Sequence, residues 1–157
     1  RLILNNVLFP AAKKKKMLVD ITRSIAKGGT QDDSKMLLKK SNCRGRWKPF
    51  CKRMGQYFPE GKHSFTYWPL KPATRRAEDI PAGTMIFFLH TPRRALPYQV
   101  YHVGVVAKDV LGRTTLIHAS KNAGKVVEVN LKKYLENIPK RHVKWPVLGV
   151  MLFAPVD

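Results

Sequence analysis

Apolar and polar positions in the second half of the chain form short apolar runs separated by polar turns. The runs predict five strands, at 84–89, 100–108, 114–119, 125–131 and 146–153. The turn at 109–113 is short enough to join the second strand to the third as a hairpin. At 131–138, Tyr134, Leu135 and Ile138 follow helical spacing and predict a short helix.

The first half of the chain has the spacing of helices. Apolar residues from Met17 to Ala26 recur at intervals of three and four, and Gly28-Gly29 ends the helix that they predict. Ser41-Asn42 is typical of a helix N-cap, so a second helix is expected from there to Gly55. Pro49 either kinks this second helix or marks its first turn.

Less regular segments join these elements. We expect a polar turn at 30–34, a short basic segment at 35–40 and an irregular loop at 56–82, which is rich in proline and aromatic residues. Helices followed by strands predict an α+β fold, with N-terminal helices packed on a roughly five-stranded, mostly antiparallel sheet. The 157 residues suit a single domain, with an N-terminal arm and helix at 1–40 and a core at 41–157.

The charge of the chain is strongly positive. Thirty lysines and arginines against ten acidic residues leave a formal net charge of +20. A field of this size attracts polyanions such as nucleic acids, anionic membranes or the bacterial cell wall, and charge alone does not choose among them. No apolar run is as long as a membrane span, and the first residue, Arg1, indicates a processed chain or part of a longer one.

Cys43 is a candidate nucleophile because it lies at the first turn of the second predicted helix. Unpaired backbone N–H groups and the positive end of the helix dipole there favour the thiolate over the thiol. Cys51 falls mid-helix on an apolar face and is expected to be a core residue. Eight residues of helix separate the two sulfurs by roughly 12 Å of rise, so a disulfide between them is not expected.

His102 and His118 are the candidate partners of this thiol. His102 opens one predicted strand and His118 lies in the next, across the short hairpin turn. His102 would act as general base and then acid, His118 would orient it, and backbone N–H groups at the helix start would form an oxyanion hole. The alternative, that each histidine is only structural, has about equal weight on spacing alone.

Other polar and aromatic residues have weaker assignments. Tyr67 and Trp68 lie in the predicted aromatic loop and could line a substrate groove, although a loop held to the core by its own aromatics fits equally well. Tyr101 and Ser120, each next to or near a candidate histidine, are further substrate-binding candidates. His90 is a weaker alternative partner for the thiol, and His63 and His142 receive no role.

Several of these motifs resemble the NlpC/P60 papain-like cysteine peptidases. The similar segments are Asn42-Cys43-Arg44-Gly45, Gly55 followed by Pro59, Ile80 to Phe88, His102-Val103-Gly104-Val105, Ile117-His118-Ala119-Ser120 and Val126 to Val129. The similarity runs from about Asn42 to Val150. Asn42, Arg44 and Thr84 differ from the family's usual Asp, Ser and Asp. The related CHAP amidases share the order of cysteine and histidine, but the Ile-His-Ala segment looks more like NlpC/P60.

The resemblance implies a thiol hydrolase of amide bonds in peptidoglycan stem peptides, or of the link between muramic acid and peptide. Cys43 would attack the carbonyl carbon, with His102 and His118 in the roles above and with no metal or cofactor. We expect a monomer that is secreted or acts in the cell envelope or periplasm, and delivery into a target cell as an effector or toxin is one such role. Such a protein could have a cognate immunity or inhibitor protein, and no specific nucleic acid is expected.

Two alternatives remain from the sequence. The same fold can support an acyltransferase or a thiol peptidase that acts on proteins. A non-enzymatic, basic polyanion-binding domain would account for the charge and for Lys13 to Lys16, although the chain carries no nucleic-acid-binding signature.

Overall fold

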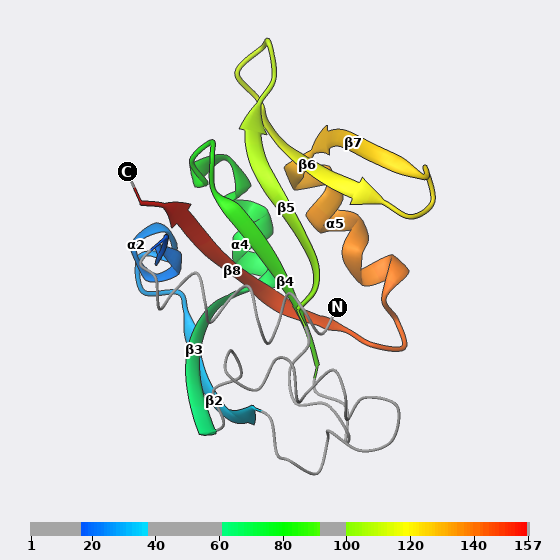
Figure 1. Cartoon of the computed structure of the whole chain (residues 1–157). Coiled ribbons are helices and arrows are strands. Elements are labelled where there is room, and N and C mark those ends of the chain that lie inside the picture. The colour runs from blue at the N-terminus through cyan, green and yellow to red at the C-terminus, as the bar shows by residue number, and fades with distance from the viewer. Residues whose placement is uncertain (1–16, 38–60, 92–99, 157) are drawn as a thin grey trace.

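The computed structural model of the chain describes residues 17–37, 61–91 and 100–156, without the side chains of 33–37 and 61–65 (Figure 1). The strands are β1 (Leu18–Asp20), β2 (Gln31–Leu37), β3 (Gly61–Pro69), β4 (Met85–His90), β5 (Val100–Lys108), β6 (Thr114–Ser120), β7 (Lys125–Asn130) and β8 (Val147–Pro155). The helices are α2 (Thr22–Ala26), α4 (Leu70–Arg75), a short 3₁₀ helix (Ala77–Asp79) and α5 (Leu131–Arg141).

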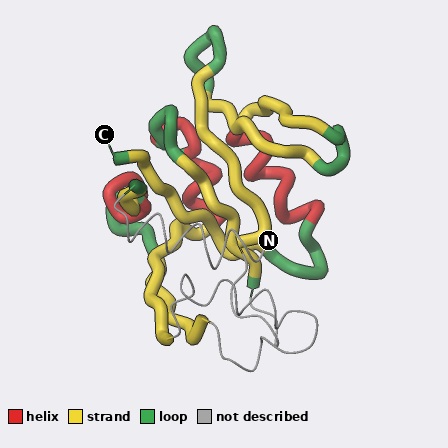
Figure 2. The backbone as a smooth tube through the Cα atoms, in the orientation of Figure 1, coloured by secondary structure: helices red, strands yellow, loops and turns green. Residues whose placement is uncertain are grey.

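The strands form one antiparallel sheet of eight strands, in the order β2-β3-β8-β4-β5-β6-β7. The eighth strand, β1, pairs with the last part of β8, whose first part pairs with β3. The C-terminal strand therefore lies in the middle of the sheet, between β4 and the two N-terminal strands (Figure 2). The predicted α+β class with a mostly antiparallel sheet is confirmed, but the sheet has eight strands rather than about five.

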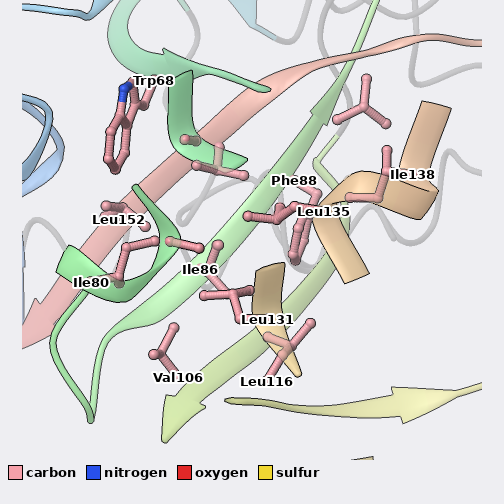
Figure 3. Close-up of a cluster of buried hydrophobic side chains, with 14 of the residues drawn as sticks. Trp68, Ile80, Ile86, Phe88, Val106, Leu116, Leu131, Leu135, Ile138 and Leu152 are labelled. Carbon is pink, nitrogen blue, oxygen red and sulfur yellow. The ribbon is translucent and has the colours of Figure 1, made fainter. Parts of the chain in front are cut away.

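One face of the sheet packs against α4 and α5, and most of the core lies between them. Fully buried side chains on β4, β5 and β6 include Ile86, Phe88, Val106 and Leu116, and α5 adds Leu131, Leu135 and Ile138 to the same cluster (Figure 3). Phe88 and Leu116, both fully buried, face this helix layer. Burial of one such side chain is worth about 2 kcal/mol of folding free energy, so the helix layer is a strong constraint on where β4, β5 and β6 lie.

The opposite face of the central strands carries a second apolar cluster. It includes Phe87, Leu89, Met151 and Phe153, with Phe87 and Phe153 packed edge to face at 5.6 Å between ring centroids. Because side chains alternate along a strand, Phe87 and Leu89 point away from the helices that cover Phe88. A strand buried on both faces explains the continuous apolar run at 85–89.

The N-terminal helix is shorter than its apolar spacing predicts. Leu18–Asp20 is the strand β1, and only Thr22–Ala26 is helical. The Asp20 carboxylate accepts a hydrogen bond from the Thr22 backbone N–H, and Thr22 exchanges hydrogen bonds with Leu152 of β8. Pairing with β8 therefore replaces the first turns of the expected helix. The predicted stop is confirmed, since Lys27 and Gly28 have positive φ angles.

Two segments expected to be irregular are regular. Residues 31–37, assigned in part to a polar turn, form β2, and the supposed loop at 56–82 contains β3, α4 and the 3₁₀ helix. β3 pairs with β2 over seven residue pairs and joins the sheet through Trp68 and Pro69. The prolines are compatible with regular structure here, because Pro69 ends a strand and Pro72 falls in the first turn of α4, where a missing N–H costs little.

The hairpin between β5 and β6 is confirmed, with Val105 opposite Ile117 and Lys108 opposite Thr114. Its turn is closed by the Asp109 carboxylate, which accepts hydrogen bonds from the backbone N–H groups of Leu111 and Arg113. Gly112 adopts φ 73° there, a conformation that favours glycine. The pairing fixes which residues of the two strands share a face.

Several predictions fall outside the described residues. These are the arm at 1–12, the lysines at 13–16, the second helix from Ser41 to Gly55 with Cys43 and Cys51, and the boundary at residue 40. Within the part of the chain that the structure describes, no helix is long and apolar enough to cross a membrane.

Candidate active site

A β-bulge at the start of β5 brings two neighbouring side chains to the same side of the strand. Phe88 of β4 pairs with His102, and Leu89 pairs with Val100, so Tyr101 is the extra residue. Neighbours on a regular strand point to opposite faces. Here the rings of Tyr101 and His102 lie 6.0 Å apart at 29°, and both contact Phe88 on the helix-covered face. The bulge thus directs His102 and Tyr101 together toward the α5 side.

His118 reaches His102 from the neighbouring strand. In β6, His118 lies two residues after Leu116, whose side chain packs in the helix-covered core, so the two share a face. His102 Nε2 and His118 Nδ1 are 2.8 Å apart, a hydrogen-bond distance. The structure therefore brings together the two histidines that the sequence selected.

The contact determines what each ring nitrogen can do. One of the two imidazoles must donate and the other accept, and the contact is compatible with either tautomer. In one of them, His102 Nε2 carries the proton and His118 Nδ1 accepts. His102 Nδ1 then carries a lone pair and is the basic atom of the pair. A hydrogen bond at Nε2 also fixes the orientation of the ring, which is the role expected of His118.

Burial controls the electrostatics of the pair. It lowers the pKa of His102 from 6.5 to about 4, with further lowering by the charges of His118 and His142. Burial also lowers the pKa of His118, opposed by a backbone hydrogen bond with Ala119 and reinforced by the positive charge of Arg141. In the described surroundings both rings are therefore neutral at pH 7, as a base requires.

Tyr134 of α5 covers the histidine pair. Its ring is 4.9 Å from His118, 6.2 Å from His102 and 5.5 Å from Phe88. Burial raises the pKa of Tyr134, so its hydroxyl is protonated at neutral pH. Three elements, β5, β6 and α5, thus hold the pair between aromatic rings, and that packing limits rotation of the imidazoles.

A second group of rings continues from His102 through Tyr101. Tyr101 stacks on His90 at 4.0 Å and lies 4.7 Å from His142, and the two imidazoles are 5.1 Å apart. His90, the weaker alternative partner of the thiol, stacks on Tyr101. His142 was given no role because it follows a predicted helix in a basic segment. No local signal places it beside His90 and Tyr101, which lie on two strands much earlier in the chain.

The other candidate residues are placed as follows. Tyr67 and Trp68 are buried on opposite faces of the sheet, Trp68 among the core residues that face the helices, so neither side chain offers an exposed surface to a substrate. The Ser120 hydroxyl accepts a hydrogen bond from the Ala123 backbone N–H and closes the turn after β6. Tyr101 is half-buried, and its hydroxyl has no hydrogen-bond partner among the described residues. Cys43 lies outside those residues.

The fold is shared with several solved structures. A Legionella pneumophila protein of the DUF1460 family superposes with a TM-score of 0.68 at 17% identity, covering 93% of this chain and 58% of its own. An N-acetylmuramoyl-L-alanine amidase from Bacteroides uniformis gives 0.59 at 17% identity, with 93% and 60% covered. A Bacteroides fragilis protein provisionally named a xylanase gives 0.57 at 17% identity, with 91% and 61% covered. No protein-family model matches the sequence, and no curated protein matches it either.

The chain therefore shares its fold with solved structures that include an N-acetylmuramoyl-L-alanine amidase. The chain spans about three fifths of the length of the structures that it matches. At 17% sequence identity the similarity lies in the backbone fold, and the chemistry of this chain depends on its own residues.

Proposed function

We propose that this chain is a cysteine-dependent amidase of the NlpC/P60 type that hydrolyses an amide bond in peptidoglycan stem peptides. The observation that carries the proposal is the 2.8 Å contact between His102 Nε2 and His118 Nδ1. With the proton on His102 Nε2, the tautomer that the proposal takes, His102 Nδ1 is the basic atom, within a fold shared with an N-acetylmuramoyl-L-alanine amidase. A base oriented by a third polar group is the arrangement that thiol nucleophiles use.

In the proposed reaction, His102 Nδ1 takes the proton of the Cys43 thiol. The thiolate sulfur attacks the amide carbonyl carbon, forming a C–S bond and an oxyanion. When the C–N bond breaks, His102 gives that proton to the leaving amine. A water molecule, deprotonated by His102, then attacks the thioester, and the carboxylic acid and the free thiol are released. His118 holds the His102 ring during both proton transfers.

The polar groups at the site favour an amidase over a glycosidase. Glycosidases use a pair of carboxyl groups, one as acid and one as base or nucleophile. In the described part of the chain, no Asp or Glu side chain hydrogen-bonds to His102 or His118, and the polar contact at the site joins two imidazoles. Imidazole chemistry suits transfer of an acyl group to a thiol.

The net charge of +20 fits this substrate, because bacterial walls are rich in phosphate and carboxylate groups. We extend the proposal to a protein that is secreted or works in the cell envelope or periplasm, as a wall-remodelling enzyme or a lytic effector. In the latter role, a cognate immunity protein would protect the producing cell.

Digestion of purified peptidoglycan followed by mass analysis of the released fragments tests the proposal. The wild-type protein is expected to release fragments that identify one cleaved amide bond, and Cys43→Ala is expected to release none. Cys51→Ala is the matched control, because it removes the other thiol and should leave the activity in place.

The activity, the nucleophile and the substrate class are tested separately. Lysis by Cys43→Ala at the wild-type rate would rule out Cys43 as the nucleophile. Alkylation of Cys43 by a thiol-directed probe, with no fragments from any peptidoglycan, would instead favour an acyltransferase or a peptidase acting on proteins.

A further inference from the structure

The C-terminal end of α5 extends the site beyond the histidine pair. The helix continues past Pro139 to Arg141, three residues further than the apolar spacing predicts, and the His142 backbone N–H donates to the Ile138 carbonyl. Tyr134, Ile138 and Arg141 are separated by four and three residues and so share one face of the helix. Tyr134 on that face contacts His118, which directs the face toward the site.

Arg141 is close to site residues on two elements. It immediately precedes His142, whose ring contacts Tyr101 and His90. Its positive charge acts on His118 of β6 as well as on Tyr134 and His142, and in each case it lowers the pKa of that group. The Arg141 charge is therefore within electrostatic reach of His118, from the end of the helix that covers the histidine pair.

Among the arginines of the described residues, Arg141 and Arg75 have no ion pair to a described residue, whereas three others do. Arg23, Arg76 and Arg113 each form an ion pair with a carboxylate, at Asp32, Asp79 and Asp109 respectively. Arg141 is exposed and has no ion pair or hydrogen bond to any described residue. A free guanidinium beside imidazoles that must become positive during catalysis is unfavourable unless an anion lies near it.

We propose that Arg141 binds a free carboxylate of the substrate and so makes the enzyme selective for anionic stem peptides. This inference rests on the proposed function and adds the substrate group that is recognised. The planar guanidinium forms two parallel hydrogen bonds with a carboxylate, which orients the peptide as well as attracting it. The bound anion also offsets the positive charge that develops on His102.

A basic residue in the last turn of a helix has an ordinary structural use, because it interacts favourably with the helix dipole. Lys140 lies in the same turn and has the same use, but no effect of its charge on the histidines is found. Lys140→Gln therefore matches Arg141→Gln in charge and in helix position. Only the second change should alter substrate selection.

The test compares synthetic stem peptides that differ only in amidation of a carboxylate. One pair differs at the α-carboxylate of D-glutamate and a second pair differs at the peptide C-terminus. Arg141→Gln is expected to lower kcat/KM by about tenfold to a hundredfold, the usual range for a lost charged hydrogen bond. The loss should appear mainly in KM and only with the peptide whose critical carboxylate is free.

Lys140→Gln should keep the wild-type preference, and Arg141→Lys should restore part of it. Equal losses on the free and amidated forms of both pairs would overturn the inference while leaving the amidase proposal intact. A wild-type protein that cleaves no stem peptide would overturn the amidase proposal itself.

A measurement that needs no turnover keeps the two proposals apart. The dipeptide L-alanyl-γ-D-glutamate is titrated into protein with isotope-labelled histidines. Shifts of the His118 and His142 signals in the wild type and in Lys140→Gln, but not in Arg141→Gln, would support carboxylate binding at Arg141. An absence of shifts in the wild type, or the same shifts in all three proteins, would overturn it.

Discussion

The two halves of β5 perform different tasks although they belong to one strand of one sheet. From Gly104 onward the strand is regular, with Val106 buried in the helix-covered core and Val105 exposed on the other face. At its beginning the bulge at Tyr101 interrupts this alternation. Tyr101 and His102 then lie on the same side, among five further rings.

The regular half is specified by close packing. A Cβ atom at Gly104 would lie 2.4 Å from Leu116 Cδ1 and 2.9 Å from the Ile117 carbonyl oxygen, so β5 and β6 approach more closely there than a side chain permits. This approach fixes the β5–β6 pairing that carries His118 to His102. The comparison shows that the regular half of β5, which contains Gly104, positions the strands, whereas the bulged half positions His102 and Tyr101.

Removal of the His102 side chain is expected to have the largest effect on activity. It changes the bulged half of β5 and leaves the regular half intact. His102→Ala should lower kcat/KM for peptidoglycan fragments by about 10³-fold or more, within the range of general acid–base catalysis. Its free energy of unfolding should change by only about 1 kcal/mol, since the regular half is intact. Turnover assays and urea unfolding measure the two quantities.

Val105→Ala is the control for this change, because Val105 lies on the same strand but faces away from α5. It should leave activity near the wild-type value. Wild-type activity in folded His102→Ala would remove His102 from the mechanism.

Substitution of Gly104 is expected to act on stability instead. Gly104→Ala forces Leu116 and the Ile117 carbonyl to move, and overpacking of this kind costs about 1–3 kcal/mol. For a chain of this size each kcal/mol lowers Tm by about 2–4 °C. Calorimetry measures the shift, and an unchanged Tm would mean that the strands have more room than the structure indicates. Activity per folded molecule should fall much less than in His102→Ala.

A third expected effect is the pH dependence of stability that His102 causes. Because its pKa lies at about 4 in the folded chain and at its ordinary 6.5 when unfolded, the folded state binds fewer protons between these values. Stability is therefore complete above about pH 6.5 and falls as the pH drops toward 4. Unfolding of Cys43→Ala protein between pH 7 and 4 should show this loss, and His102→Gln should reduce it.

A titration of His102 also tests the placement of the Cys43 thiol. Cys43→Ala leaves His102 with its lowered pKa, whereas a thiolate beside the ring stabilises the imidazolium and raises the pKa of His102 in the wild-type protein. NMR of labelled histidines measures both values. Identical values in the two proteins would place Cys43 away from His102.

The apolar runs were sufficient to predict most of the second half of the fold. The strands from β4 to β8 and the helix α5 appear near their predicted positions. A strand or helix that packs against a core has apolar residues at the spacing of its own backbone geometry, and this spacing is visible in the sequence. The same reasoning found the His102–His118 pair. Two consecutive strands that are joined by a short hairpin turn lie side by side.

The first half was predicted poorly because its strands depend on distant partners. β1 exists because Leu18–Asp20 pairs with residues 153–155, and β2 because it pairs with β3 across a long intervening segment. The apolar spacing of 17–26 fits a helix as an isolated segment. Backbone pairing with β8 outweighs that local preference.

The sequence by itself determined the class of the fold, the hairpin and the identity of the two paired histidines, since each follows from local periodicity and short connections. Only the tertiary structure decided that Tyr101 shares a side with His102, that His142 joins the site from the end of α5, and that Trp68 belongs to the core. These outcomes depend on one unpaired residue in a strand and on contacts between segments far apart in the chain. The free energy that fixes such contacts comes from burial against partners that no local pattern identifies.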